Sequence, residues 1–168
     1  MEDNPGDVTL VAEAFAEAGI GCGIQNVRDG REAIRHLEEA AAGGRPLPDL
    51  VLLDLNLPGV GGLEVLSWAK SHPTLKNIPV VVFTGSQLDV DLQSSYDRHA
   101  NCYVTKPNSL EEYHLVVTAV FDFWSRIVCL PSYGLAANRQ PGKAVTVDGA
   151  GGRNRGWSPA CLVIAREG

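Results

Sequence analysis

One stretch near the middle of the chain constrains the fold more than any other. Residues 50–53 are an unbroken apolar run, and Asp54 follows this run directly. The turn residues Pro58 and Gly59 come shortly afterwards. A short apolar run bounded by turn residues is typical of a strand buried on both faces. A carboxylate just after it lies at the carboxyl end of the strand, where open α/β sheets place their sites. The sequence therefore predicts a buried strand with a functional carboxylate at its end.

Two further apolar runs end in polar residues of the kind found in sites. Residues 80–83 lead into Thr84, and residues 102–105 lead into Lys106. A weaker strand is predicted over residues 23–27. The carboxyl ends of parallel strands lie at one edge of a sheet, so we expect Asp54, Thr84 and Lys106 to lie close together.

Helical periodicity separates these runs. It predicts helices over about residues 4–19, 31–42, 63–71, 89–98 and 110–130. Alternating strand and helix signals favour a doubly wound parallel sheet. The glycine-containing segment 59–62 lacks the Gly-Lys-Ser/Thr of a phosphate-binding loop, and we interpret it as a flexible turn.

Two of the predicted helices differ from ordinary surface helices. The helix over residues 89–98 has few apolar residues, as expected of a lightly packed element that responds to a switch. The helix over residues 110–130 is apolar on more than one face. It has more apolar residues than one face packed on the sheet requires. The additional ones, which include Phe121 and Trp124, predict a second face that binds a partner.

Charge and composition exclude several classes of function. Residues 1–131 contain 9 Lys and Arg against 18 Asp and Glu, whereas residues 132–168 contain 5 against 2. An acidic body argues against nucleic-acid binding. No apolar stretch is long enough to span a membrane, and the acidic start is unlike a signal peptide, so we expect a cytoplasmic protein with no membrane partner. The four cysteines are widely separated and predict neither a zinc site nor a disulfide framework.

Taken together, the motifs resemble a known family, the receiver domain of two-component response regulators. They are Glu2-Asp3-Asn4-Pro5, Asp54-Leu55-Asn56-Leu57-Pro58-Gly59, Thr84-Gly85-Ser86 and Thr105-Lys106-Pro107. His99-Ala100-Asn101-Cys102-Tyr103 and Phe123-Trp124 are similar to the single-domain regulators that partner bacterial phytochrome-type histidine kinases. The resemblance covers about residues 1–131. It implies a flavodoxin-like (βα)5 receiver fold with strand order 2-1-3-4-5 and no enzymatic activity in the ordinary sense.

The resemblance also implies the chemistry of the site. Asp54 is expected to be the phosphoacceptor, receiving a phosphoryl group from a histidine kinase. Asp3, Asp54 and the backbone carbonyl of Asn56 are expected to hold Mg²⁺, with Glu2 assisting through water. Clustered carboxylates suit this ion because Mg²⁺ prefers oxygen ligands and accepts a phosphate oxygen as a further ligand.

The remaining site residues are assigned by the same resemblance. Lys106 is expected to place a positive charge on the phosphoryl oxygens, aimed inward by a cis Lys106–Pro107 bond. Thr84 is expected to donate its hydroxyl to the phosphoryl group. Tyr103 occupies the aromatic switch position, so that Thr84 and Tyr103 together would alter the surface around the helix 89–98, the strand 102–105 and the helix 110–130. A homodimer or another protein partner could bind there, through the strand 102–105 and the helix 110–130.

The chain departs from the family at its beginning. Met1 stands where the last residue of the first strand would stand, so that strand is missing from the sequence. Either the sequence starts downstream of the natural start, or another segment replaces the strand. We expect residues 132–168 to be a Gly- and Arg-rich, mostly disordered tail. The alternative is that the apolar run 161–165 forms a short parallel strand in the vacant position, which a linker of this length would reach.

Other functions stay open at this point. A phosphatase with an aspartyl nucleophile commonly needs a second carboxylate two residues later, where this chain has Asn56. A pseudo-receiver that binds partners without phosphorylation is favoured only by the missing strand. Residues 132–168 show too little helical pattern for a DNA-binding module, so a regulator of this kind would signal through protein contacts.

Overall fold

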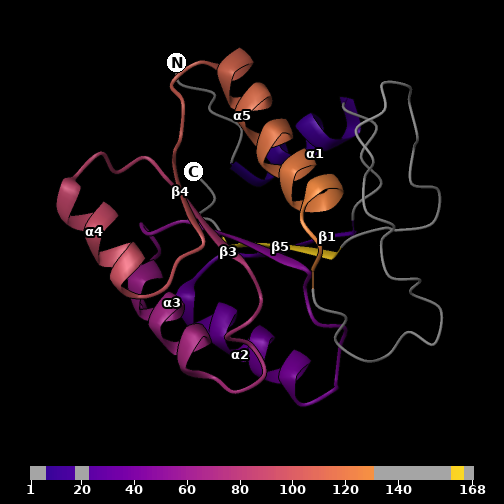
Figure 1. Cartoon of the computed structure of the whole chain (residues 1–168), viewed down its shortest axis with the longest axis vertical. Helices are drawn as coiled ribbons and strands as arrows, with labels where there is room; N and C mark the ends of the chain where they lie inside the picture. The colour runs from indigo at the N-terminus through magenta and orange to yellow at the C-terminus, as the bar shows by residue number, and fades with distance from the viewer. Residues whose placement is uncertain (1–6, 18–22, 131–159, 165–168) are drawn as a thin grey trace.

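The computed structural model describes residues 7–17, 23–130 and 160–164, which form a five-stranded sheet between two groups of helices (Figure 1). The strands are β1 (Gly23–Val27), β2 (Leu50–Leu53), β3 (Val80–Thr84), β4 (Cys102–Thr105) and β5 (Ala160–Ile164). The helices are α1 (Asp7–Glu17), α2 (Gly30–Ala41), α3 (Gly62–Ser71), α4 (Asp89–Asp97) and α5 (Leu110–Asp122), which continues into the π-helical turn η1 (Phe123–Ile127). The predicted alternation of strands and helices is confirmed.

The sheet is doubly wound, with helices on both faces. Its strand order is β1-β5-β2-β3-β4, and every neighbouring pair is parallel. Helices α1 and α5 cover one face and contact each other, while α2, α3 and α4 lie over the other (Figure 1). Strands β2 and β3 are buried along their whole length, as predicted from their apolar runs.

The core has two halves because successive side chains of a strand point to opposite faces. On the α1 and α5 face, Leu50, Leu52 and Phe83 pack in one cluster with Val11 and Val117. On the other face, a second cluster is formed by side chains of β1, β2, β3, β5, α2 and α3. It includes Val27, Leu37, Val51, Leu53, Val65, Leu66, Val82 and Ile164. The sheet is thus the shared wall of two apolar cores.

Strand β5 occupies a central position in the sheet although it is the last element of the chain. It pairs with β1 from Gly23↔Ala160 to Val27↔Ile164 and with β2 from Leu50↔Cys161 to Leu53↔Ile164. This is the place that the family's first strand takes in the order 2-1-3-4-5. The structure thus has a parallel strand at residues 160–164, which overlaps the alternative prediction of a strand over 161–165 and begins one residue earlier, where the first expectation was a disordered tail. The rest of the tail, residues 132–159 and 165–168, lies outside the described residues.

The two unusual helices behave differently from each other. Helix α4 buries only Ser95 and exposes Val90, Leu92 and Tyr96, which confirms that it is lightly packed. Helix α5 buries Phe121, which is only 2% exposed, so its assignment to the partner-binding face is wrong. Periodicity reveals two apolar faces of a helix but not which of them meets the sheet. The exposed apolar side chains of this region are Leu110, Leu115, Phe123 and Ile127. Among the described helices, none has the length and apolar character to cross a membrane.

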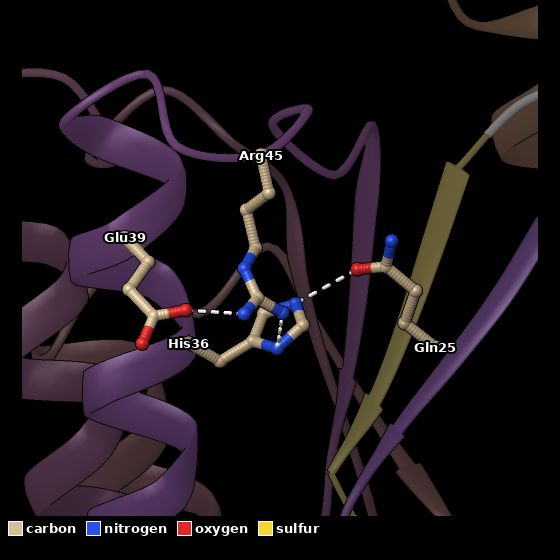
Figure 2. Close-up of polar contacts among 4 residues, drawn as sticks. All are labelled: Gln25, His36, Glu39 and Arg45. Atoms are coloured by element: carbon tan, nitrogen blue, oxygen red, sulfur yellow. Dashed lines mark hydrogen bonds and ion pairs between the residues drawn. The ribbon is translucent and has the colours of Figure 1, made fainter.

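A polar network lies between α2 and β1, the edge strand of the sheet (Figure 2). His36 on α2 is 2.7 Å from Gln25 Oε1 through Nε2 and 2.7 Å from Arg45 Nη1 through Nδ1. Arg45 also pairs with Glu39. Since the guanidinium can only donate, Nδ1 must accept and the proton of the neutral ring lies on Nε2. Burial lowers the pKa of His36, and the charge of Arg45 lowers it further.

Candidate functional site

Asp54 stands at the end of β2 and is held by three contacts. Its side chain is only 7% exposed, and Oδ2 is 2.6 Å from Lys106 Nζ. The backbone N–H of Asn56 donates to Oδ1 at 3.0 Å. The backbone N–H of Asp54 itself donates to the carbonyl of Ile164 at 2.9 Å, across the β2–β5 pairing. Both the orientation of the carboxylate and the position of its backbone are therefore fixed.

Lys106 follows β4 and reaches Asp54 from two strands away. Its backbone N–H donates to the Thr84 carbonyl at 2.8 Å, which anchors the start of the loop after β4 to the end of β3. The side chain is 14% exposed, and Nζ lies 5.8 Å from the centroid of the Phe83 ring. The Lys106–Pro107 bond is trans in this structure, so the expectation of a cis bond is wrong. Trans is the ordinary preference of bonds before proline.

Thr84 is fully buried at the end of β3, and the loop after it links the site to α4 and β4. Its Oγ1 accepts from the Ser86 N–H at 3.3 Å. Ser86 makes three further hydrogen bonds. Its Oγ donates to Asp91 Oδ2 at 2.5 Å and accepts from the Leu88 N–H at 3.4 Å, and its carbonyl accepts from the Tyr103 hydroxyl at 3.0 Å. Burial raises the pKa of Tyr103, and the carboxylates of Asp91 and Asp54 also raise it. The phenol is therefore a neutral donor.

Gly62 sets how closely α3 approaches the end of β2. A Cβ at this position would lie 2.2 Å from the Asp54 carbonyl oxygen and 2.6 Å from Leu55 Cα. The Gly62 N–H donates to the Leu55 carbonyl at 3.1 Å. The interpretation of residues 59–62 as a flexible turn missed this, since close backbone approach leaves no mark in a sequence except the glycine itself.

The structure thus brings five of the predicted site residues to one edge of the sheet. Asp54, Asn56 and Lys106 are in direct contact, Thr84 is joined to Lys106 through the backbone, and Tyr103 is joined through Ser86. Glu2 and Asp3 lie outside the described residues, so their roles stay predictions.

Besides Gly62, sequence reasoning missed two residues of this edge. The motif Thr84-Gly85-Ser86 gives Ser86 no predicted role of its own, although a hydroxyl two residues beyond Thr84 can form hydrogen bonds with the turn and with the next helix. Ile164 belongs to the apolar run 161–165, but the composition of this run does not predict that the Ile164 carbonyl accepts a hydrogen bond from Asp54.

The donor set fits part of a divalent metal site. The contacts with Lys106 and Asn56 use two of the roughly four lone-pair positions of the Asp54 carboxylate, so both oxygens keep capacity for a cation. Among the described residues, no group of three or more His, Cys, Asp or Glu side chains could hold a metal by itself. Mg²⁺ is commonly held by one or two carboxylates together with waters and phosphate oxygens, so this set is sufficient only with such additional ligands.

These observations define a class before they define a family. A doubly wound parallel sheet with Asp, Thr and Lys at the ends of three adjacent strands is a flavodoxin-like receiver fold. The family profile described as "Response regulator receiver domain" matches residues 1–118. The chain therefore belongs to the response regulator receiver domain family, whose members are signalling modules of two-component systems.

Named relatives agree with this assignment. The probable methanogenesis regulatory protein FilR2 of Methanothrix harundinacea is 41% identical over 144 residues, which is 86% of each chain. Response regulator Rcp1 of Synechocystis sp. is 40% identical over 79% of this chain and 90% of its own, and its Mn²⁺-bound form superposes with a TM-score of 0.70, covering 75% of this chain and 91% of that one. The phosphorylated cyanobacterial phytochrome response regulator RcpA is 44% identical over 79% of this chain and 95% of its own, with a TM-score of 0.72.

Proposed function

We propose that this chain is a phosphorylation-controlled response regulator in which Asp54 accepts a phosphoryl group from a histidine kinase. The observation that supports it most is the contact of 2.6 Å between the Asp54 carboxylate and the Lys106 ammonium, shielded from solvent at the carboxyl edge of the sheet. A carboxylate nucleophile beside a fixed positive charge is the arrangement that phosphoryl transfer requires, because this reaction depends on positioning and charge neutralisation.

The chemistry would proceed by direct displacement. One carboxylate oxygen of Asp54 forms the bond to phosphorus while the bond from phosphorus to the donor imidazole nitrogen breaks, and that nitrogen keeps the electron pair. Lys106 neutralises charge on the transferred group, and the Asn56 N–H keeps the carboxylate oriented. Asp54, Asp3 and the Asn56 carbonyl would hold Mg²⁺, with Glu2 assisting through water, and the ion would add to the charge neutralisation. The relative Rcp1 has been solved in a Mn²⁺-bound form, which supports the proposal that this chain binds a divalent metal.

The switch would run from Thr84 to the α4 edge of the molecule. If the Thr84 hydroxyl turns to the phosphoryl group, it gives up its bond with the Ser86 N–H. Ser86 holds both Tyr103 and Asp91, so a shift of this loop changes the contacts of β4 and of α4 together. Because α4 buries only Ser95, little packing energy opposes its movement.

The partners would be proteins. The likeness to RcpA, a phytochrome response regulator, favours a phytochrome-type histidine kinase as phosphoryl donor. The side chains of Leu115, Phe123 and Ile127 on α5 and η1 are apolar and exposed, so a homodimer would form through β4 and α5. The acidic body of the chain argues against nucleic acid as a partner.

Intact-mass analysis tests the proposal. The 168-residue protein is incubated with acetyl phosphate, with Mg²⁺ or with a chelator, and compared with Asp54→Asn and with Asp97→Asn, an exposed carboxylate of α4 as the matched control. We expect one phosphoryl increment that needs Mg²⁺, is lost in Asp54→Asn and is kept in Asp97→Asn. An unmodified protein under all conditions would instead favour the phosphorylation-independent pseudo-receiver.

A further inference from the structure

Strand β5 differs from the other four strands in how it is connected. It pairs with β1 and β2 across a sequence separation of more than one hundred residues. The 29 residues 131–159 lie between the end of the last helix region and this strand. At about 3.3 Å for each extended residue, this connection is far longer than the sheet is wide. A connection of this length is long enough for the strand to leave the sheet while the rest of the chain keeps its place.

The position of β5 makes its presence costly to lose. Ile164 is fully buried and packs in the cluster that contains Leu37, Leu53 and Val65. Both neighbours of β5 would be left with an open edge if it were withdrawn, and unpaired backbone groups in a buried setting are unfavourable. The two neighbours do not depend on β5 for their other contacts, because β2 pairs with β3 and β1 contacts α2. The position of β5 between β1 and β2, here called the slot, is thus bounded by two strands that are also held by other elements of the fold.

The slot is also in direct contact with the site around Asp54. The Ile164 carbonyl accepts the backbone N–H of Asp54 at 2.9 Å, so the residue that carries the nucleophile is bonded directly to the last residue of β5. The same carboxylate must keep its orientation toward Lys106 and the Asn56 N–H. Withdrawal of β5 removes one of the three contacts that fix Asp54 and opens the core beneath it.

We propose that the gap between β1 and β2 is a strand-acceptor site, and that residues 160–164 of the same chain are an exchangeable occupant whose seating decides whether Asp54 is competent for phosphorylation. The ligand class is a short, extended, apolar segment that pairs in parallel on both sides. The part of this proposal that concerns phosphorylation rests on the function proposed above. Because coupling between two sites is reciprocal, a phosphoryl group on Asp54 stabilises the seated strand.

The test uses the full chain, purified folded, with a specific protease sequence inserted between Val147 and Asp148 and cut afterwards. An isotope-labelled peptide of residues 158–168 is then added in excess, and a peptide with Ile164→Asp serves as the matched control. We expect the cut fragment to stay bound at high protein concentration, to exchange with the labelled peptide, and not to exchange with the control peptide. A fragment that stays bound and never exchanges would overturn the acceptor site.

The second arm measures what the strand does. On dilution, release of the fragment should lower the rate of phosphoryl uptake from acetyl phosphate by about tenfold or more, and added peptide 158–168 should restore it. Release with an unchanged rate would overturn the coupling to Asp54. If the uncut chain takes up no phosphoryl group, the proposed function has failed. Amide exchange at Leu52–Asp54 then tests the strand-acceptor site without reference to phosphorylation, since the protection of these amides must fall when the fragment is released.

Discussion

The carboxyl end of β2 and the edge formed by α4 and β4 belong to the same site but are held in different ways. Asp54 is fixed by an ion pair, by two backbone hydrogen bonds and by the close approach of α3 at Gly62. The α4 edge is joined to the site mainly through the hydrogen bonds of Ser86, and α4 itself buries a single residue. The carboxylate that we propose as nucleophile is held by several contacts, whereas the surface that would respond to its phosphorylation is attached by few.

The largest expected effect comes from breaking the ion pair on the rigid side. Lys106→Ala leaves the Asp54 carboxylate buried without its cation, and removing one partner of a buried pair costs about 3–5 kcal/mol. Urea unfolding should show this loss. The double variant Lys106→Ala with Asp54→Asn should recover much of it, because the uncompensated charge is gone. Equal stability of the single variant and the native protein would show that the pair is not buried in solution.

A smaller effect is expected from the approach of α3. In Gly62→Ala the new Cβ meets the backbone of Asp54 and Leu55, and such overpacking costs about 1–3 kcal/mol. Gly61→Ala is the control, since a Cβ there meets nothing within 4 Å and its φ is −68°. Thermal unfolding should give a lower midpoint for Gly62→Ala than for Gly61→Ala. Similar midpoints would mean that α3 does not hold the end of β2.

On the loose side the expected effect is smaller still. Tyr103→Phe removes the hydroxyl that donates to the Ser86 carbonyl and should cost about 1 kcal/mol. Amide exchange should rise in the β3–α4 loop while β2 keeps its protection. A rise in β2 as well would mean that the two regions are not separate.

The smallest effect lies outside both regions, at the network of Figure 2, and concerns pH. Because the pKa of His36 is lowered by burial and by Arg45, the folded state binds fewer protons than the unfolded chain. Its contribution to stability is complete above the ordinary histidine pKa of about 6.5 and is lost as pH falls below it. In urea unfolding between pH about 7.5 and about 5.5, the free energy of unfolding should decline less steeply for His36→Ala than for the native protein. An identical slope would contradict the assignment.

The same contrast separates what the sequence could predict from what it could not. The apolar runs of β2 and β3 predicted both strands and the placement of Asp54 and Thr84 at their ends, because burial on both faces leaves a continuous pattern. Phe121 was misassigned because two apolar faces of one helix look alike in a sequence. Strand β5 could be offered only as an alternative, since a five-residue apolar run reads the same in a strand and in a free tail. Contacts made by backbone atoms, such as those of Gly62 and Ile164, leave almost no sequence signal.

The most direct test of this contrast is amide hydrogen exchange measured with and without continuous phosphorylation by acetyl phosphate and Mg²⁺, with Asp54→Asn as the control. The account predicts that exchange changes in α4, β4 and the loop containing Ser86, that β2 and β3 stay protected, and that Asp54→Asn shows no change. Phosphorylation that leaves the α4 edge unaltered, or that loosens β2 and β3 equally, would contradict it.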